Sequence, residues 1–301
     1  MNLLITGAWR EAQEHFTESE TKHKIVFMPQ EAEALPCDPS WVEGVICNGL
    51  FLNHPIENFK NLRYIQLTSA GYDRVDLDYV RAHGIEIHNA QGVYSIPMAE
   101  FAIAGVLQLY KQSRFFYENQ KARRWEKHRG LMELNGKTVL ILGCGSVGTE
   151  CARRFRAFGC RVIGLNRTVR ENPDFDEIHV LTELDKLLPM ADIALLSLGL
   201  NAETKHIMND MRLQSLKEGA VLVNLARGGL VDEEALLPQL SRLTGAVLDV
   251  FEKEPLPISS PLWEHENVIL TPHNSFVSEG NGERLTRVIN NKLKIFVAEE
   301  G

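Results

Sequence analysis

Residues 138–148 read TVLILGCGSVG, and this stretch decides the fold of the chain. An apolar run of strand length leads into the GxGxxG spacing of Gly143, Gly145 and Gly148, and a helical pattern follows. In a strand–turn–helix unit the first glycine permits the tight turn, the second lets the backbone approach a pyrophosphate, and the third lets helix and strand pack closely. The stretch therefore predicts a dinucleotide-binding domain, with a plain strand–turn–helix joint as the alternative.

The helix after the glycines is the second half of the motif. Its leading amides, at Ser146 and Val147, are predicted to face the phosphates, because the first N–H groups of a helix have no intrahelical acceptor and favour anions. Cys144 lies inside the loop, where only its backbone matters to this geometry. We interpret its side chain as a small apolar group without a chemical role, with a reactive thiol as the alternative.

Strand-like and helical segments alternate on both sides of this motif, which predicts parallel sheets covered on both faces. The predicted fold class is α/β, with two doubly wound parallel-sheet domains, one flavodoxin-like and one Rossmann, and a cleft between them. Strands are expected at 3–6, 24–28, 44–47, 64–68 and 85–88, and then at 138–142, 161–165, 193–198, 220–226, 246–251 and 267–271. Helices are expected at 55–62 (PIENFKNL), 76–84, 95–114, 146–158, 184–191 (LDKLLPMA), 232–242 (DEEALLPQLSR) and 278–300.

Composition narrows the class of protein. The 301 residues are 44% hydrophobic and 24% charged, which is typical of a globular protein with room for two domains. The net charge of −8 and the short, broken basic run KARRWEKHR (121–129) disfavour nucleic-acid binding. Apolar runs are too short to span a membrane, and the N-terminus lacks the pattern of a signal peptide. Five cysteines without metal-type spacing fit reduced thiols and no metal site, so we expect a cytoplasmic protein.

Three polar segments follow strands in the second half of the chain. They contain Arg227 in NLARGG, Glu254 in DVFEKEP and His273 in ILTPH. Because the carboxyl ends of parallel strands face the ligand crevice, these side chains are predicted to converge there. Each has a structural alternative taken singly: an arginine that caps a turn, a glutamate that is a loop charge, and a surface histidine. A histidine beside a carboxylate and an arginine is a set suited to proton transfer at a carboxylic acid substrate.

The chain resembles the D-isomer-specific 2-hydroxyacid dehydrogenase family from about Thr68 to Asn274. The segments that carry the resemblance are TSAGYDRVD, NAQGVYSIPMAE, LNGKTVLILGCGSVG, ETKHIMN, SLKEGAVLVNLARGGLVDEEAL, AVLDVFEKEPL and SPLWEHENVILTPH. The resemblance implies a substrate-binding domain formed by 1–92 and 277–301 and a coenzyme domain formed by 93–276. It also implies an oxidoreductase that uses NAD(H) or NADP(H), and a homodimer formed through residues 99–135. The sequence itself adds aromatic residues in that segment that we expect to be exposed, which are Phe115, Phe116, Tyr117 and Trp125.

The resemblance assigns roles to single residues. Arg227 corresponds to the substrate-binding arginine, Glu254 to the partner of the histidine, and His273 to the proton donor. The backbone amides of Ala70 and Gly71 correspond to a second cradle for the substrate carboxylate. The implied cofactor contacts are Gly143, Gly145, Ser146, Val147, Gly148, Asn166, Arg167, Thr168, Leu225, Ala226, Arg227, Asp249, His273 and Ser275, with Asp249 at the nicotinamide carboxamide.

The stretch VIGLNRT (162–168) departs from the usual pattern of NAD enzymes. Asn166 stands where an acidic residue commonly binds the adenosine ribose, and Arg167 and Thr168 follow it. An acid would repel a 2′-phosphate, whereas asparagine does not, and arginine and hydroxyl groups can donate to phosphate oxygens. We therefore predict a preference for NADP(H), with Arg170 as a further candidate, and NAD(H) as the alternative cofactor.

The predicted activity is reduction of a small 2-keto acid, such as glyoxylate or hydroxypyruvate, to the D-2-hydroxy acid. Two alternatives stay open. One is a phosphoglycerate dehydrogenase without a regulatory domain, and the other is a dinucleotide-sensing, non-catalytic protein like the corepressors that share this fold. The sequence does not distinguish the acyl chain of the substrate, because one or two methylenes change binding by only about 1–3 kcal/mol.

Overall fold

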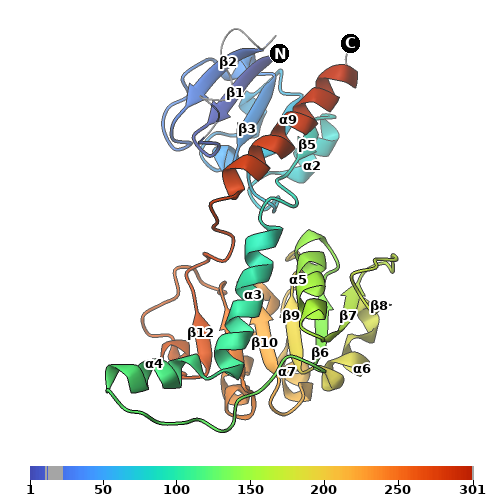
Figure 1. Cartoon of the computed structure of the whole chain (residues 1–301). Coiled ribbons are helices and arrows are strands. Elements are labelled where there is room, and N and C mark those ends of the chain that lie inside the picture. The colour runs from blue at the N-terminus through green and yellow to red at the C-terminus, as the bar shows by residue number, and fades with distance from the viewer. Residues whose placement is uncertain (11, 13–22, 300–301) are drawn as a thin grey trace. The chain divides into compact units, whose positions relative to one another are not determined.

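The computed structural model describes residues 1–10, 12 and 23–299, and divides the chain into two compact units (Figure 1). One unit comprises Met1–Tyr94 together with Ser278–Gly301, and the other comprises Ser95–Val277. Each unit is built on a parallel sheet of its own. No helix in the described ranges is long and apolar enough to cross a membrane.

The unit that contains both termini has a five-stranded sheet in the order β2-β1-β3-β4-β5, which is the strand order of flavodoxin-like folds. The strands are β1 (Asn2–Thr6), β2 (Lys24–Met28), β3 (Gly44–Cys47), β4 (Tyr64–Leu67) and β5 (Glu86–His88). Successive side chains of a strand point to opposite faces, so each face has its own core. On one face the core includes Val80 of α2 (Leu77–Ala82), and on the other it includes Leu285, Ile289 and Leu293 of α9 (Asn281–Glu299).

The predicted helix at 55–62 is wrong. Only one 3-10 turn forms there, η3 (Ile56–Asn58). Ile56, Phe59 and Leu62 are all buried, so their spacing of three reflects anchors of a turn that lies against the core rather than one stripe of an α-helix. Other short 3-10 turns in this unit are η1 (Pro39–Trp41) and η2 (Leu50–Leu52).

The second unit has a seven-stranded parallel sheet in the order β12-β11-β10-β9-β6-β7-β8. The strands are β6 (Thr138–Leu142), β7 (Arg161–Asn166), β8 (Glu177–Val180), β9 (Ile193–Leu196), β10 (Val221–Asn224), β11 (Gly245–Leu248) and β12 (Val268–Leu270). This is the Rossmann order with one added strand, and its order reverses between β6 and β9, where such sheets bind their ligands. The edge strand β8 was not expected from the sequence.

Helices cover both faces of this sheet. Val139 and Ile141 of β6 pack with α3 (Ser95–Tyr110) and α5 (Ser146–Ala157), which lie across the near face in Figure 1. Leu140 and Leu142 point the other way, into the core shared with the shorter helices. These are α6 (Leu184–Leu187), α7 (Asp210–Ser215) and α8 (Glu233–Leu236), with 3-10 segments η4 (Leu181–Glu183), η5 (Leu188–Met190), η6 (Gly228–Leu230), η7 (Leu237–Arg242) and η8 (Pro261–Glu264).

Three helices of this unit end earlier than the sequence predicted. The helix expected at 95–114 stops at Tyr110, because Gln112 adopts the left-handed conformation (φ 53°), and a separate helix α4 (Ser113–Lys121) follows. The segments LDKLLPMA and DEEALLPQLSR each form one α-helical turn that continues as a 3-10 helix at Pro189 or Pro238. Proline has no N–H for the α-helical ladder, which explains the change.

Candidate active site

The loop between β6 and α5 has the geometry that its three glycines require. Gly143 has a φ of 105°, which favours glycine, and a Cβ at Gly148 would lie 2.0 Å from the carbonyl oxygen of Gly143. Ser197, at the end of β9, donates its hydroxyl to that same oxygen over 2.7 Å. By contrast, a Cβ at Gly145 would meet nothing within 4 Å. Open space beside Gly145 at the start of α5 fits the pyrophosphate of a dinucleotide.

The segment at the end of β7 contains the residues predicted to contact the adenosine ribose of the cofactor. Asn166 ends the strand and is half-buried, while Arg167, Thr168 and Arg170 are exposed. The chain is then fixed at Asn172, whose side chain donates to Thr149 Oγ1 over 2.9 Å and accepts from Asp174 N over 3.0 Å. Because Thr149 lies in α5, this hydrogen bond joins the segment after β7 to the helix that follows the glycine loop.

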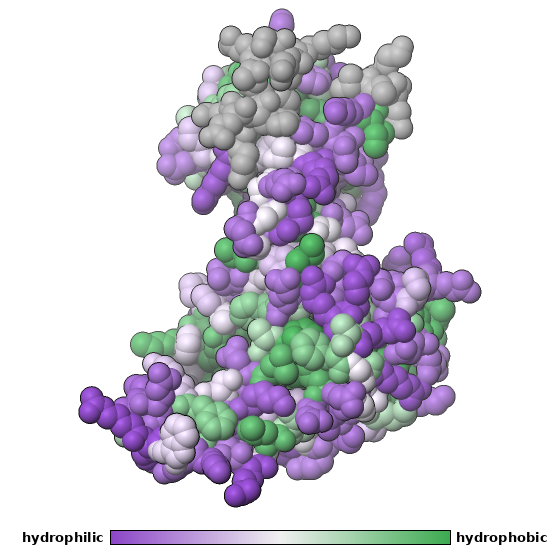
Figure 2. All heavy atoms as spheres, in the orientation of Figure 1, coloured by the Kyte–Doolittle hydropathy of each residue, from purple (hydrophilic) through white to green (hydrophobic). Residues whose placement is uncertain are grey.

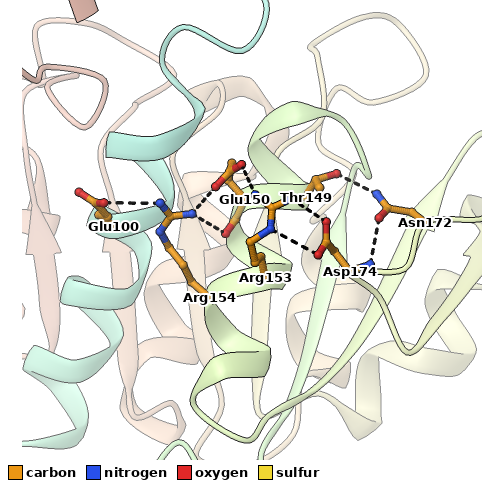
Figure 3. Close-up of polar contacts among 7 residues, drawn as sticks. All are labelled: Glu100, Thr149, Glu150, Arg153, Arg154, Asn172 and Asp174. Atoms are coloured by element: carbon orange, nitrogen blue, oxygen red, sulfur yellow. Dashed lines mark hydrogen bonds and ion pairs between the residues drawn. The ribbon is translucent and has the colours of Figure 1, made fainter. Parts of the chain in front are cut away.

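Figure 3 shows the remainder of this connection. Arg153 of α5 contacts Asp174 over 3.0 Å and Glu150 over 2.7 Å. Its neighbour Arg154 pairs with Glu150 and reaches Glu100 of α3 at 3.5 Å. These polar contacts join α5 to α3 on one side and to residues 172–174 on the other, and together they fix the position of α5.

Arg227 follows β10 and is half-buried. Asn224, which is 1% exposed, donates its side-chain amide to Arg227 O over 2.9 Å, and its Oδ1 accepts from Ala226 N over 3.2 Å. The next residue, Gly228, packs so tightly that a Cβ there would lie 1.9 Å from the carbonyl carbon of Phe251. The arginine loop is therefore seated directly on the segment that leads to Glu254.

His273 and Glu254 form a pair, with His273 Nδ1 2.9 Å from Glu254 Oε2. The other oxygen of Glu254 accepts from Phe251 N over 3.0 Å, which orients the carboxylate. Both side chains are partly open, 42% and 38% exposed. Their separation and exposure suit a histidine that exchanges a proton with a ligand while one ring nitrogen stays fixed.

The remaining predicted residues fall into two groups. Leu225, Ala226, Asp249 and Ser275 are buried around the loops that contain Arg227 and His273. Ala70 and Gly71 belong to the other unit, in the turn after β4, where Ala70 O accepts from the side chain of Asn89 over 2.6 Å and Gly71 O from Ser69 Oγ over 3.0 Å.

Sequence reasoning missed the residues that support the site. Asn224 holds the arginine loop, and Thr271 donates its hydroxyl to Asp249 over 2.6 Å. Both are polar residues at the ends of apolar strands, the same signal that singled out Arg227 and His273. Nothing in the local sequence shows which partner each of them contacts.

Other predicted features concern the thiols and metals. The five cysteines are free, and burial raises the pKa of the Cys144 thiol to about 11. At neutral pH this thiol is protonated, which agrees with its interpretation as a small apolar group without a chemical role. Within residues 1–10, 12 and 23–299 no group of histidine, cysteine and acidic side chains could hold a metal ion.

Comparison with known proteins decides the family. A sequence model of the NAD-binding domain of D-isomer-specific 2-hydroxyacid dehydrogenases matches residues 103–275, which include the glycine loop, Arg227, Glu254 and His273. The chain belongs to the D-isomer-specific 2-hydroxyacid dehydrogenase family. Glyoxylate reductases of Thermofilum pendens and Korarchaeum cryptofilum are each 34% identical to it, over 71% and 78% of this chain and over 65% and 73% of their own lengths.

Solved structures of this dehydrogenase family have the same fold. A family protein of Aeromonas salmonicida is 30% identical with a TM-score of 0.84, over 99% of this chain and 96% of that one. A dehydrogenase of Xanthobacter autotrophicus in complex with NADPH and MES is 26% identical (TM-score 0.80; 98% and 95% covered). A D-lactate dehydrogenase of Aquifex aeolicus with NAD and lactic acid is 26% identical (TM-score 0.80; 99% and 96% covered). The predicted family, fold and oxidoreductase class, with a nicotinamide dinucleotide as cofactor, are confirmed.

Proposed function

We propose that the protein reduces a small 2-keto acid, of the glyoxylate or hydroxypyruvate type, to the D-2-hydroxy acid. The observation that carries the proposal is the pair formed by His273 Nδ1 and Glu254 Oε2 at 2.9 Å, seated beside the loop that contains Arg227. The similarity to glyoxylate reductases supports this substrate class. When bound, the reduced nicotinamide supplies a hydride to the keto carbon.

His273 is the proton donor in this proposal. Hydride transfer leaves negative charge on the former keto oxygen, and that oxygen must receive a proton. With Nδ1–H directed at Glu254, the imidazolium presents its second proton, on Nε2, to the substrate. Glu254 in turn is held by Phe251 N, which donates to its other oxygen over 3.0 Å, so the carboxylate fixes the orientation of the ring.

Arg227 orients the substrate. Its guanidinium offers a planar fork of donors that can bind a carboxylate oxygen and the keto oxygen together, and its charge stabilises the developing alkoxide. The amides of Ala70 and Gly71 are proposed as the second cradle for the carboxylate, in line with the family resemblance. The contacts of Asn224 with residues 226 and 227 fix the backbone from which the guanidinium extends.

Turnover with a panel of 2-keto acids, measured with NADH and with NADPH, tests this function. Reduction of glyoxylate or hydroxypyruvate is the expected result. Faster oxidation of 3-phosphoglycerate than of any small 2-hydroxy acid would instead support the phosphoglycerate dehydrogenase alternative. Dinucleotide binding without turnover of any acid would support a non-catalytic sensor.

For the cofactor we propose a preference for NADPH. Asn166 replaces the acidic residue that would repel a 2′-phosphate, and Arg167, Thr168 and Arg170 expose donors next to it. Arg167 and Arg170 are both exposed, so their guanidinium groups can turn to a phosphate. Relatives of the same fold bind NADPH in one case and NAD in another, so the preference rests on these residues.

We also propose a homodimer formed through residues 99–135. Phe116, Tyr117 and Trp125 are 40%, 58% and 97% exposed, and Figure 2 shows hydrophobic residues among hydrophilic ones on the surface over α4. Phe115, expected to be exposed, is instead half-buried against Phe116 and His128. Light scattering of the wild type and of Trp125→Lys tests the proposal, since a dimer should weaken in the variant and a wild-type monomer would contradict it.

A further inference from the structure

Ser197 lies directly after β9, beside the strand that leads into the glycine loop. Its N–H donates to Leu142 O over 2.8 Å, which continues the pairing of β9 with β6 by one residue. Its hydroxyl lies 2.7 Å from Gly143 O and 3.2 Å from Leu142 O. Because Leu142 O already accepts from the Ser197 N–H, the shorter contact, with Gly143 O, is the one that the hydroxyl adds.

The carbonyl group of Gly143 is enclosed by the structure. Gly143 is buried, and its φ of 105° turns the chain out of β6. On one side, α5 comes so close that a Cβ at Gly148 would lie 2.0 Å from Gly143 O. The oxygen therefore lies between the first turn of α5 and the hydroxyl of Ser197.

The direction of this carbonyl also sets the direction of an amide in the loop. In a trans peptide the C=O and N–H groups point to opposite sides. With Gly143 O directed at Ser197, the N–H of Cys144 points away from Ser197 and Gly148. Backbone amides at the start of a helix are the groups that approach a bound phosphate. The hydroxyl of Ser197 thus fixes the orientation of a peptide in the loop that we expect to receive the pyrophosphate.

We propose that Ser197 is a positioning residue for the cofactor, which holds the Gly143–Cys144 peptide in the orientation that binds the pyrophosphate. The proposal concerns the dinucleotide and not the acid, so it does not depend on which 2-keto acid is the substrate. It adds a residue of the β9 end to a motif whose sequence pattern covers only β6, the loop and α5.

Removal of the hydroxyl leaves the carbonyl two choices. In Ser197→Ala, Gly143 O would stay enclosed without this donor, or the peptide would rotate and bring the oxygen to water. Glycine permits that rotation, because it has no Cβ to restrict its backbone angles. Loss of a donor to a buried carbonyl shifts the balance between the two orientations by about 10- to 100-fold. The apparent Kd of the cofactor then rises by the reciprocal of the fraction that keeps the binding orientation.

Cys144 reports the orientation of this peptide without a ligand. A Cβ at Gly164 would lie 2.5 Å from Cys144 Sγ, so the thiol packs against β7. Burial raises the pKa of this thiol to about 11, and the protonated thiol reacts slowly at pH 8. Rotation of the peptide before Cys144 changes the φ of Cys144 and would withdraw the thiol from β7. Alkylation of Cys144 should therefore become faster when the peptide rotates.

Two variants test the proposal, Ser197→Ala and the control Thr244→Val. Thr244 lies just before β11, and its hydroxyl donates to Gly219 O over 2.6 Å. Gly219 also has a positive φ, of 74°. The control therefore removes the same kind of hydrogen bond, between a hydroxyl and the carbonyl of a turning glycine, at the opposite edge of the same sheet. Thermal melting of both variants shows the loss of stability that this kind of bond causes.

The first measurement is the Kd of NADH and of NADPH, by fluorescence titration. In Ser197→Ala both values should rise by about 3- to 10-fold and by the same factor, because the two cofactors share the pyrophosphate. Thr244→Val should leave both Kd values equal to those of the wild type. Unchanged Kd values in Ser197→Ala would overturn the proposal.

The second measurement is the rate of alkylation of Cys144 at pH 8 in cofactor-free protein, followed by peptide mapping. Ser197→Ala should react about 3- to 10-fold faster than the wild type, and Thr244→Val at the wild-type rate. A raised Kd with an unchanged rate of alkylation would show that Ser197 contacts the cofactor directly, which would overturn the positioning role. A wild type that binds NADPH and reduces no 2-keto acid would refute the proposed activity, while both measurements would still decide the role of Ser197.

Discussion

Two segments at the carboxyl edge of the seven-stranded sheet differ in how firmly the protein holds them. Residues 271–275 follow β12 and are fixed by hydrogen bonds to Asp249 and by the contact of His273 with Glu254. Residues 167–170 follow β7, and their side chains are exposed. The segment to which we assign the chemistry is thus fixed by contacts within the protein, whereas the segment to which we assign the choice of cofactor exposes its side chains.

This difference has a physical basis. Proton transfer requires a donor within hydrogen-bond reach and in one orientation, so mobility there lowers the rate directly. Binding of a phosphate by arginine tolerates several rotamers, and the entropy lost on ordering reduces affinity only in part. The second segment is still attached, because Asn172 is held by Thr149 of α5. This contact fixes the end of the segment, and the side chains of Arg167 and Arg170 are exposed.

The largest effect is expected at the firmly held segment. His273→Ala should lose at least about 100-fold in kcat, the usual scale of general acid catalysis, because His273 is the proton donor in the proposed mechanism. Folding and cofactor Kd should stay close to those of the wild type. Steady-state kinetics with circular dichroism and cofactor titration check this, and near-normal turnover would remove His273 from the mechanism.

Arg227→Lys should have the next largest effect. The ammonium keeps the charge but cannot present the fork that binds the carboxylate and the keto oxygen together. Loss of one charge-assisted hydrogen bond, worth about 1.5–3 kcal/mol, corresponds to about a 10- to 100-fold fall in kcat/KM. Cofactor Kd should not change. If lysine restores most of the activity, the arginine supplies only diffuse charge.

Most of the second unit could be predicted from sequence because its strands are buried runs with polar residues at their ends. Strand β6 is an example, because Val139 and Ile141 are buried on one face of the sheet and Leu140 and Leu142 on the other. A strand that is buried on both faces has a continuous apolar sequence. The break at Gln112 could not be predicted, because a left-handed glutamine has no local signal. The ends of the α-helical turns before Pro189 and Pro238 could have been predicted, since proline interrupts α-helices.

The candidate site divides in the same way. Strand ends and the family resemblance singled out Arg227, Glu254 and His273 as candidates, and the structure places His273 beside Glu254. The contacts of Asp249 with Thr271, Asn274 and Ser275 join segments more than twenty residues apart, so no spacing in the sequence indicates them. The strand β8 was missed because its alternating EIHV pattern is only half-buried.

We expect a smaller effect from substitutions in the exposed segment that follows β7. Asn166→Asp combined with Arg167→Ala should reverse a preference for NADPH over NADH. The aspartate would accept hydrogen bonds from the ribose hydroxyls and repel a 2′-phosphate, and the change in preference should be about 10- to 100-fold. kcat with the favoured cofactor should stay within a few fold, because the His273 loop is untouched. Equal kcat/KM for NADPH and NADH in the wild type would contradict the prediction.

The smallest effect is expected at Cys144, which lies in the glycine loop between these two regions. A Cβ at Gly164 of β7 would lie 2.5 Å from Cys144 Sγ, so the thiol packs against the neighbouring strand. The loop therefore uses only the backbone of Cys144. Burial raises the pKa of this thiol to about 11, so the thiol is protonated at pH 8 and its reactive thiolate is scarce.

Alkylation of Cys144 at pH 8 should therefore be about 100-fold slower than that of an exposed thiol, and its rate should rise as the pH approaches 11. Cys144→Ser, the reference for peptide mapping of the label, should change cofactor Kd by less than about threefold, because the loop binds through its N–H groups. Rapid labelling of Cys144 together with loss of cofactor binding would show that this loop contains a reactive group after all.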